Sequence, residues 1–394
     1  VISRFLNATT ADGFNPYRVN RDGIDWEVPE PGNPWSNIGY WSDHQIIYLQ
    51  KLLELAENAN PGMFGNLLSR RVFATANVPY RLRPYRDLLI DPYHTIDFDR
   101  DEHQRVMERV SQIGSDGRLH LDSSGQVIHV SMAEKLLVLL LAKLANFVPG
   151  GGLWMNTQRP EWNDANNALV GKGLSVVTAA YLRRFMAFWL QRLAELPEAE
   201  LQISQPVAEW MLSSLNTLQD FAARLPDPFD STARLTFMTR MGEAASEYRV
   251  GLYKNGMAHE TTGIRLSQFG RLLQLGLTFV DSCLHQNRRD DGMFHSYNTL
   301  SVDSDGAHID RLYLMLEGQV AVLSSGYLSD PAVLTLLAAL RNSDLYREDQ
   351  NSYMLYPHRS LPGFLAKNTI PPGLADGIGL VRLLRDHGDH RLIR

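Results

Sequence analysis

Apolar residues recur at helical spacing along most of the chain. Windows in which an apolar side chain returns every three or four residues predict amphipathic helices. These windows are Ile46–Leu55, Met132–Phe147, Leu174–Leu196, Val207–Leu225, Leu235–Tyr248, Leu266–Leu284, Leu312–Leu323 and Ala332–Leu340. Within Leu174–Leu196 the apolar positions fill two adjoining stripes, as expected for a helix that is buried on more than one side. The chain is therefore predicted to be mainly helical.

Alternation typical of strands is scarce. Its best case is residues 118–130, RLHLDSSGQVIHV, which predict a peripheral β-hairpin around a Ser-Ser-Gly turn. Long loops rich in Gly, Pro, Asn and Asp separate the helices, and long ordered loops are usually functional. We expect the loops at 35–43, 150–165, 255–263 and 292–298 to meet at one end of the helices and form a cleft.

This pattern favours a fold in which helices pair into hairpins that close into a toroid, with an open helical solenoid as the alternative. No shift in composition marks a boundary, so we predict a single domain over residues 1–394, on which residues 345–394 pack as a C-terminal segment. The first residues carry neither an initiator Met nor a signal pattern, which suggests a piece of a longer protein.

Composition narrows the classes of function. The chain has 38 Lys and Arg against 44 Asp and Glu, a net charge of −6 that argues against a polybasic nucleic-acid binder. The 44% of hydrophobic and 21% of charged residues are typical of soluble globular proteins. The most apolar run, Leu136–Ala142, is too short to span a membrane. Cys283, the single cysteine, excludes an intrachain disulfide and a cysteine-based metal cluster, and a cytoplasmic location is favoured.

The segment 150–171, GGGLWMNTQRPEWNDANNALVG, is the richest in candidate chemistry. It places Trp154, Glu161, Trp162 and Asp164 in a loop before a predicted helix. Cleavage of a glycosidic bond needs a carboxylic acid that protonates the leaving oxygen and a second carboxylate. Tryptophan faces suit the apolar face of a sugar ring. The alternative is that Asp164 only caps the helix that follows.

The segment 39–45, GYWSDHQ, repeats this arrangement of aromatic and acidic residues before a helix. With Arg18 earlier in the same loop, Trp41 and Asp43 are typical of a sugar subsite. Alternatively, the tryptophan packs the loop against the helices and Asp43 caps the helix that follows.

Glu317 lies in an otherwise apolar helical window. Burial of a lone carboxylate raises its pKa or demands a partner. A general base is one reason to keep such a residue, and an ion pair with Arg311 or another arginine is the other.

Two further loops carry polar residues, and both are predicted to lie at the rim of the cleft. Residues 255–265 offer His259 and Glu260, and residues 292–298 offer His295 and Tyr297. No pair of histidines has the spacing of a helical zinc site, so no metal is expected.

Four motifs occur in a recognisable order: YRVNRDG, GYWSDHQ, EWNDANN and LEGQVA. In this order among long helices, they resemble the six-hairpin glycosidase superfamily, in particular cellobiose-type phosphorylases and glycogen-debranching-like glucosidases. The resemblance implies an (α/α)6 barrel, with Asp164 as general acid and Asp43 as a sugar-binding residue. Trp41 and Ser42 stand where the phosphorylases have an arginine. Glu317 is late in the chain, like the base of the superfamily's hydrolases, and this favours hydrolysis.

We therefore predict an all-α (α/α)6 barrel with a small peripheral β-hairpin that cleaves an oligo- or polysaccharide by inverting hydrolysis, without a cofactor or metal. Asp164 is the expected acid, Glu317 the base and Glu161 the reserve acid. The expected substrate-binding residues are Asp43, Trp41, Trp154, Trp162, Arg18, His259, Glu260 and His295.

Three alternatives remain. One is an inverting phosphorylase, and another is a non-catalytic carbohydrate-binding or scaffold module. The third is a polysaccharide lyase, in which His295 and Tyr297 move protons and Arg288 and Arg289 hold a uronate.

Overall fold

The computed structural model describes residues 1–15, 18–19, 24–25, 45–156, 169–225, 227–358 and 360–391. The chain forms two compact units, Val1–Tyr356 and Pro357–Arg394. The second unit contains the short helices α14 (Phe364–Lys367), α15 (Pro372–Ala375) and α16 (Gly379–Asp386). The features described below belong to the first unit, unless stated otherwise.

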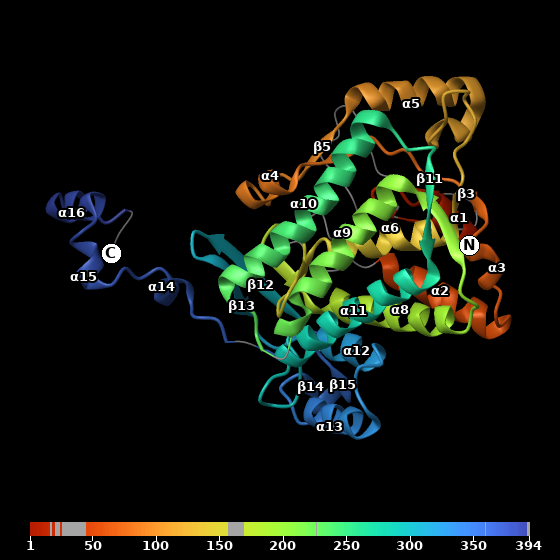
Figure 1. Ribbon diagram of the computed structural model, residues 1–394. Coiled ribbons are helices and arrows are strands. Elements are labelled where there is room, and N and C mark those ends of the chain that lie inside the picture. The colour runs from red at the N-terminus through yellow and green to blue at the C-terminus, as the bar shows by residue number, and fades with distance from the viewer. Residues whose placement is uncertain are drawn as a thin grey trace. The chain divides into compact units, whose positions relative to one another are not determined.

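All eight helical windows predicted from the sequence contain a helix (Figure 1). These helices are α2 (Gln45–Ala59), α6 (Met132–Leu144), α8 (Val176–Ala194), α9 (Gln205–Phe221), α10 (Ser231–Asn255), α11 (Leu266–Gln286), α12 (Leu316–Ser324) and α13 (Asp330–Arg341). Further helices are α1 (Ile2–Ala8), α3 (Gly65–Leu68), α4 (Tyr85–Ile90) and α5 (Arg100–Ile113). Helix α5 was not predicted because its sequence is mostly polar and only Val106 is buried.

The centre of the first unit is formed by the apolar helices. Every residue of α6 is buried, which agrees with the prediction of a core helix at Leu136–Ala142. Helix α8 packs against α2, α11 and α12, and Phe185 and Trp189 on it are fully buried. A helix that is covered on several sides needs apolar residues on more than one stripe, as the sequence of α8 has.

A five-stranded antiparallel sheet contradicts the all-α prediction. Its strands lie in the order β13-β12-β9-β8-β7. They are β7 (Phe147–Val148), β8 (Gly152–Trp154), β9 (Gly173–Ser175), β12 (Tyr297–Asp303) and β13 (Gly306–Arg311). The expected (α/α)6 barrel is therefore wrong, and the fold mixes helices and sheet.

The missed strands lack the signal that reveals a strand in sequence. Strands β7, β8 and β9 have two or three residues each, and all of these residues are buried. A strand that is covered on both faces shows no alternation of apolar and polar positions. A run of this length is also too short to distinguish from a loop.

Smaller two-stranded sheets connect the loops. They pair β1 (Arg18–Val19) with β2 (Ile24–Asp25), β3 (Arg71–Phe73) with β6 (Val130–Ser131), β4 (Tyr80–Leu82) with β5 (Ile96–Phe98), β10 (Glu200–Ser204) with β11 (Thr261–Arg265), and β14 (Tyr346–Arg347) with β15 (Ser352–Tyr353). In the segment predicted as a hairpin, Leu121 bridges Val127 across a turn in which the Gly125 N–H donates to Asp122 O.

Among the described residues, no helix is long and apolar enough to cross a membrane.

Candidate functional site

The candidate base Glu317 lies in the first turn of α12. Its side chain is half-buried, and one of its carboxylate oxygens is shielded from solvent. The free N–H groups and the dipole of a helix N-terminus favour a negatively charged side chain at this position. Arg311, the partner suggested by the sequence, donates instead to Gly150 O and to the carbonyl oxygen of Gln286.

The backbone around Glu317 is held by residues next to His295. Ser296 Oγ donates to Met315 O over 3.1 Å and accepts from the Gly318 N–H over 2.8 Å. Gln319 Nε2 donates to Phe294 O over 2.7 Å. A Cβ on Gly318 would lie 2.5 Å from Ser296 Oγ, so glycine permits this close approach. The start of α12 is thereby fixed against residues 294–296.

His295 belongs to the same region of the fold. Its Nδ1 lies 2.9 Å from Leu312 O, a contact that places the ring proton on Nδ1 and leaves Nε2 as an acceptor. Burial lowers the pKa of His295, so the neutral ring is favoured. The structure thus brings a carboxylate and a neutral imidazole to one part of the molecule.

Tyr297, which was paired with His295 in the lyase alternative, is different. It lies at the start of β12 and is only 1% exposed. Arg289, the proposed uronate ligand, forms an ion pair with Asp291 over 2.8 Å. A buried tyrosine and a paired arginine do not favour proton transfer at a uronate.

Trp154 is a core residue of the described structure. It is 6% exposed, and its indole N–H donates to Gly171 O over 2.9 Å. Its ring meets Tyr85 edge to face, with the ring centroids 6.4 Å apart. Stacking on a sugar needs an uncovered ring face, so we leave Trp154 out of the site proposed below.

Several predicted site residues lie outside the described residues. These are Trp41, Asp43, Glu161, Trp162 and Asp164, together with the side chain of Arg18. The structure does describe the residues on either side of segment 157–168, which contains Asp164. Asn156 Nδ2 donates to Asn146 Oδ1 over 2.7 Å, and the Gly171 N–H donates to Met155 O over 2.8 Å.

His259 and Glu260 lie at the opposite end of α11 from His295. They directly precede β11, which leads into the first residue of α11, whereas the His295 N–H donates to Asn287 O, just beyond the last residue of that helix. Helix α11 has 21 residues, which span about 30 Å at the usual rise. The prediction that the loops at 255–263 and 292–298 meet at one end is therefore wrong. His259 and Glu260 are not part of the site that contains Glu317.

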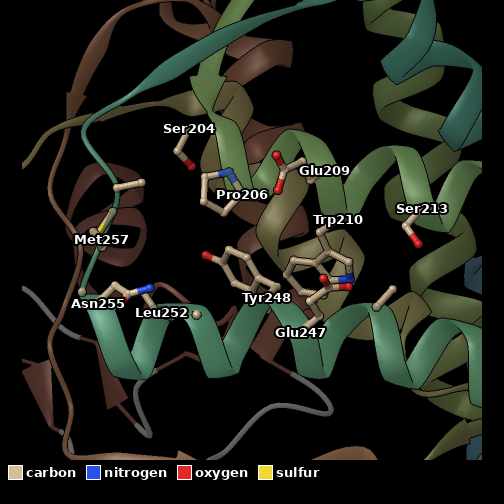
Figure 2. A pocket seen from close by; sticks show the side chains of 14 residues that line it. Ser204, Pro206, Glu209, Trp210, Ser213, Glu247, Tyr248, Leu252, Asn255 and Met257 are labelled. Carbon is tan, nitrogen blue, oxygen red and sulfur yellow. The ribbon is translucent and has the colours of Figure 1, made fainter.

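A pocket of about 290 Å³ lies near His259, between α9 and α10. Figure 2 shows Glu209 and Trp210 on α9 and Glu247 and Tyr248 on α10, all lining this space. Trp210 and Tyr248 stack with their ring centroids 4.7 Å apart. Tyr248 Oη donates to Ala11 O over 2.7 Å, and burial raises the pKa of this phenol.

This pocket is not among the sites predicted from the sequence. An acid followed directly by an aromatic residue occurs on both helices, at Glu209-Trp210 and Glu247-Tyr248. That repeated pair is a signal in the sequence, but only the packing of α9 against α10 brings the two pairs together. Both glutamates are exposed, and the pocket combines their charge with aromatic surface.

In the part of the chain that the structure describes, no group of three or more His, Cys, Asp or Glu residues is placed to hold a metal ion. Comparison of the sequence with protein-family models gives no match. A comparison with curated proteins gives no match either.

Proposed function

We propose that this protein cleaves glycosidic bonds in an oligo- or polysaccharide by inverting hydrolysis. Asp164 protonates the leaving oxygen, and Glu317 activates a water molecule on the opposite face of the sugar. Glu161 is the reserve acid, and Asp43, Trp41 and Trp162 contact the substrate. The proposal rests on the resemblance of the four ordered motifs to six-hairpin glycosidases, although the barrel expected from that resemblance is not the fold observed.

The observation that carries the proposal is the environment of Glu317. Glu317 lies in the first turn of an apolar helix, where the free N–H groups favour a carboxylate, and a positioned carboxylate is the group that a water-activating base requires. The backbone on either side is fixed by Ser296 and Gln319. A rigid carboxylate costs little reorganisation when the reaction takes place.

The test is a panel of oligosaccharides, with the anomer of the product followed by NMR. We expect turnover without phosphate and a product of inverted configuration. Turnover only with phosphate would show a phosphorylase instead. The variants Asp164→Asn and Glu317→Gln should each lose on the order of 10²–10⁴ in rate, because each removes a proton-transfer group but keeps the shape.

The matched control is Glu108→Gln, which neutralises an exposed glutamate on α5 and should keep full activity. A structural role for Asp164 predicts another pattern. If it only caps a helix, Asp164→Asn remains active, and Asp164→Ala loses activity through reduced stability. That result would assign the acid to Glu161.

A further inference from the structure

A second cavity, of about 730 Å³, lies where the start of α10, the end of α11 and strand β13 meet. Arg234 of α10, His285 of α11, and His308 and Arg311 of β13 line it. Glu317 does not line it. Cavities of this size are typical of sites for small molecules.

The two guanidinium groups are held rigidly. Arg234 donates to the carbonyl oxygens of Pro149, Ala307 and Phe229, at 2.9, 2.7 and 2.6 Å. These contacts fix the plane of its guanidinium group. A guanidinium group carries more N–H donors than the three used here. Arg234 therefore keeps donors that no hydrogen bond among the described residues uses.

Arg311 is fixed in a similar way. It donates to Gly150 O over 2.8 Å, to Gln286 O over 3.2 Å and to Asn287 Oδ1. The acceptors are neutral, so they orient the group but do not neutralise it. Within the described ranges, no carboxylate forms an ion pair with Arg234 or Arg311.

Among the residues that line the cavity, arginines outnumber acidic side chains. Burial, followed by the charge of Arg311, lowers the pKa of Arg234, and the charge of Asp230 opposes this shift. Asp310 is the acidic residue among those that line the cavity. Asp230 caps α10 and lies 3.7 Å from Arg224, and Asp303 lies 3.1 Å from His308. The lining thus carries two fixed arginines and one aspartate, and Asp230 is a second acid whose charge acts on Arg234.

We propose that this cavity binds the phosphoryl group of a small phosphorylated molecule or free phosphate. The planar forks of two guanidinium groups match the oxygens of a phosphate, and a dianion would relieve the repulsion between them. The remaining volume accommodates a sugar-sized body, and His285, Gln286 and Ser282 offer it polar contacts. This inference is independent of the proposed hydrolysis, because the cavity does not contain Glu317.

The experiment is calorimetric titration of the full chain with inorganic phosphate, glucose 6-phosphate, glucose and acetate, at constant ionic strength set with chloride. We expect both phosphates to bind, and we expect glucose, which lacks a phosphoryl group, to give no heat that the variant Arg311→Gln removes. Tighter binding of glucose 6-phosphate than of phosphate would assign the cavity to a phosphorylated sugar, and the reverse order would assign it to the free ion. Equal heats with acetate and phosphate, or no binding of either phosphate, would overturn the proposal.

Variants test whether binding occurs in this cavity. Arg311→Gln should weaken phosphate binding at least tenfold, and Arg311→Lys should weaken it less because it keeps the charge but loses the fork. Arg271→Gln, on the exposed surface of the same helix α11 as His285, is the matched control and should bind as the wild type does. If Arg311→Gln does not fold, the test rests on Arg311→Lys. An unchanged affinity of that variant for phosphate would overturn the assignment.

Discussion

At the scale of single residues, the most unusual feature is a buried lysine. Lys135 on α6 is 3% exposed, and its Nζ donates to Thr9 O over 2.9 Å and to Thr75 Oγ1 over 3.0 Å. Neither acceptor carries a charge. Burial lowers the pKa of Lys135 to about 7, so the ammonium group loses its proton in the folded protein far more readily than in the unfolded chain.

This depressed pKa predicts a pH dependence of stability. Between pH 7 and about 10, the unfolded chain keeps the proton on Lys135 and the folded protein does not. The free energy of unfolding therefore rises with pH in that window, by up to about 1.4 kcal/mol per pH unit. The variant Lys135→Met should lack this rise. Urea unfolding at pH 7, 8 and 9 measures how the free energy of unfolding changes with pH in the wild type and in the variant. Equal changes in the two proteins would contradict the prediction.

A residue on the same helix shows the contrasting case. Glu134 is also buried, but its carboxylate accepts from Ser204 Oγ over 2.6 Å and from the Ser204 N–H over 3.1 Å. Burial is the largest effect and raises the pKa of Glu134, although these two hydrogen bonds oppose it. The carboxylate also connects the start of α6 to the start of α9. Lys135 and Glu134 are therefore buried in different surroundings. The lysine donates to neutral acceptors, whereas the carboxylate joins the starts of two helices.

At the scale of elements, the packing of α4 against α10 depends on one glycine. A Cβ on Gly242 would lie 2.1 Å from the ring of Tyr85. The same tyrosine is anchored at its backbone, where its N–H donates to Ser246 Oγ over 2.6 Å. The ring therefore has little freedom to move away from α10.

A pair of substitutions on α10 tests this contact. Gly242→Ala should lower the free energy of unfolding by about 1–3 kcal/mol, because the added methyl group overpacks the interface with Tyr85. Gly251→Ala is the matched control, since a Cβ at Gly251 meets nothing within 4 Å. It should raise stability by roughly 0.5–1 kcal/mol through helix propensity. Denaturant titration of both variants measures the difference, and equal effects would exclude close packing as the cause.

At the scale of the whole molecule, the chain divides into units of unequal size. Both hydrophobic core clusters found among the described residues lie within Val1–Tyr356. The smaller unit, Pro357–Arg394, exposes large apolar side chains instead, with Leu361 78% and Phe364 79% exposed. A unit with so little buried apolar surface contributes little to the stability of the folded chain.

Truncation after Tyr356 tests this division. We expect residues 1–356 to unfold in one cooperative transition, within about 2–4 °C of the midpoint of the full chain, because both clusters are retained. Differential scanning calorimetry of the two proteins measures the midpoints. A much lower midpoint for the truncated protein would show that the core depends on residues 357–394.

The sequence by itself determined the positions of the eight apolar helices. The start of α11 at Leu266 was predicted to the residue, and the predicted end at Leu284 is two residues short of the observed end at Gln286. Helical hydrogen bonds and the spacing of an apolar stripe are local, so both are visible in a window of the chain. The sequence also indicated that Leu136–Ala142 is buried, because a run without polar positions has no side for solvent.

Only the tertiary structure decided the sheet and the composition of each site. Leu174 pairs with Trp154 and with Asn298, a partner more than a hundred residues away, and such pairing leaves no local pattern in strands that are buried on both faces. Helix α11 separates His259 from His295, which sequence reasoning had placed together. The packing of α10, α11 and β13 brings Arg234 and Arg311 to one cavity. Proximity between distant residues depends on how the elements pack, and periodicity along the chain does not encode it.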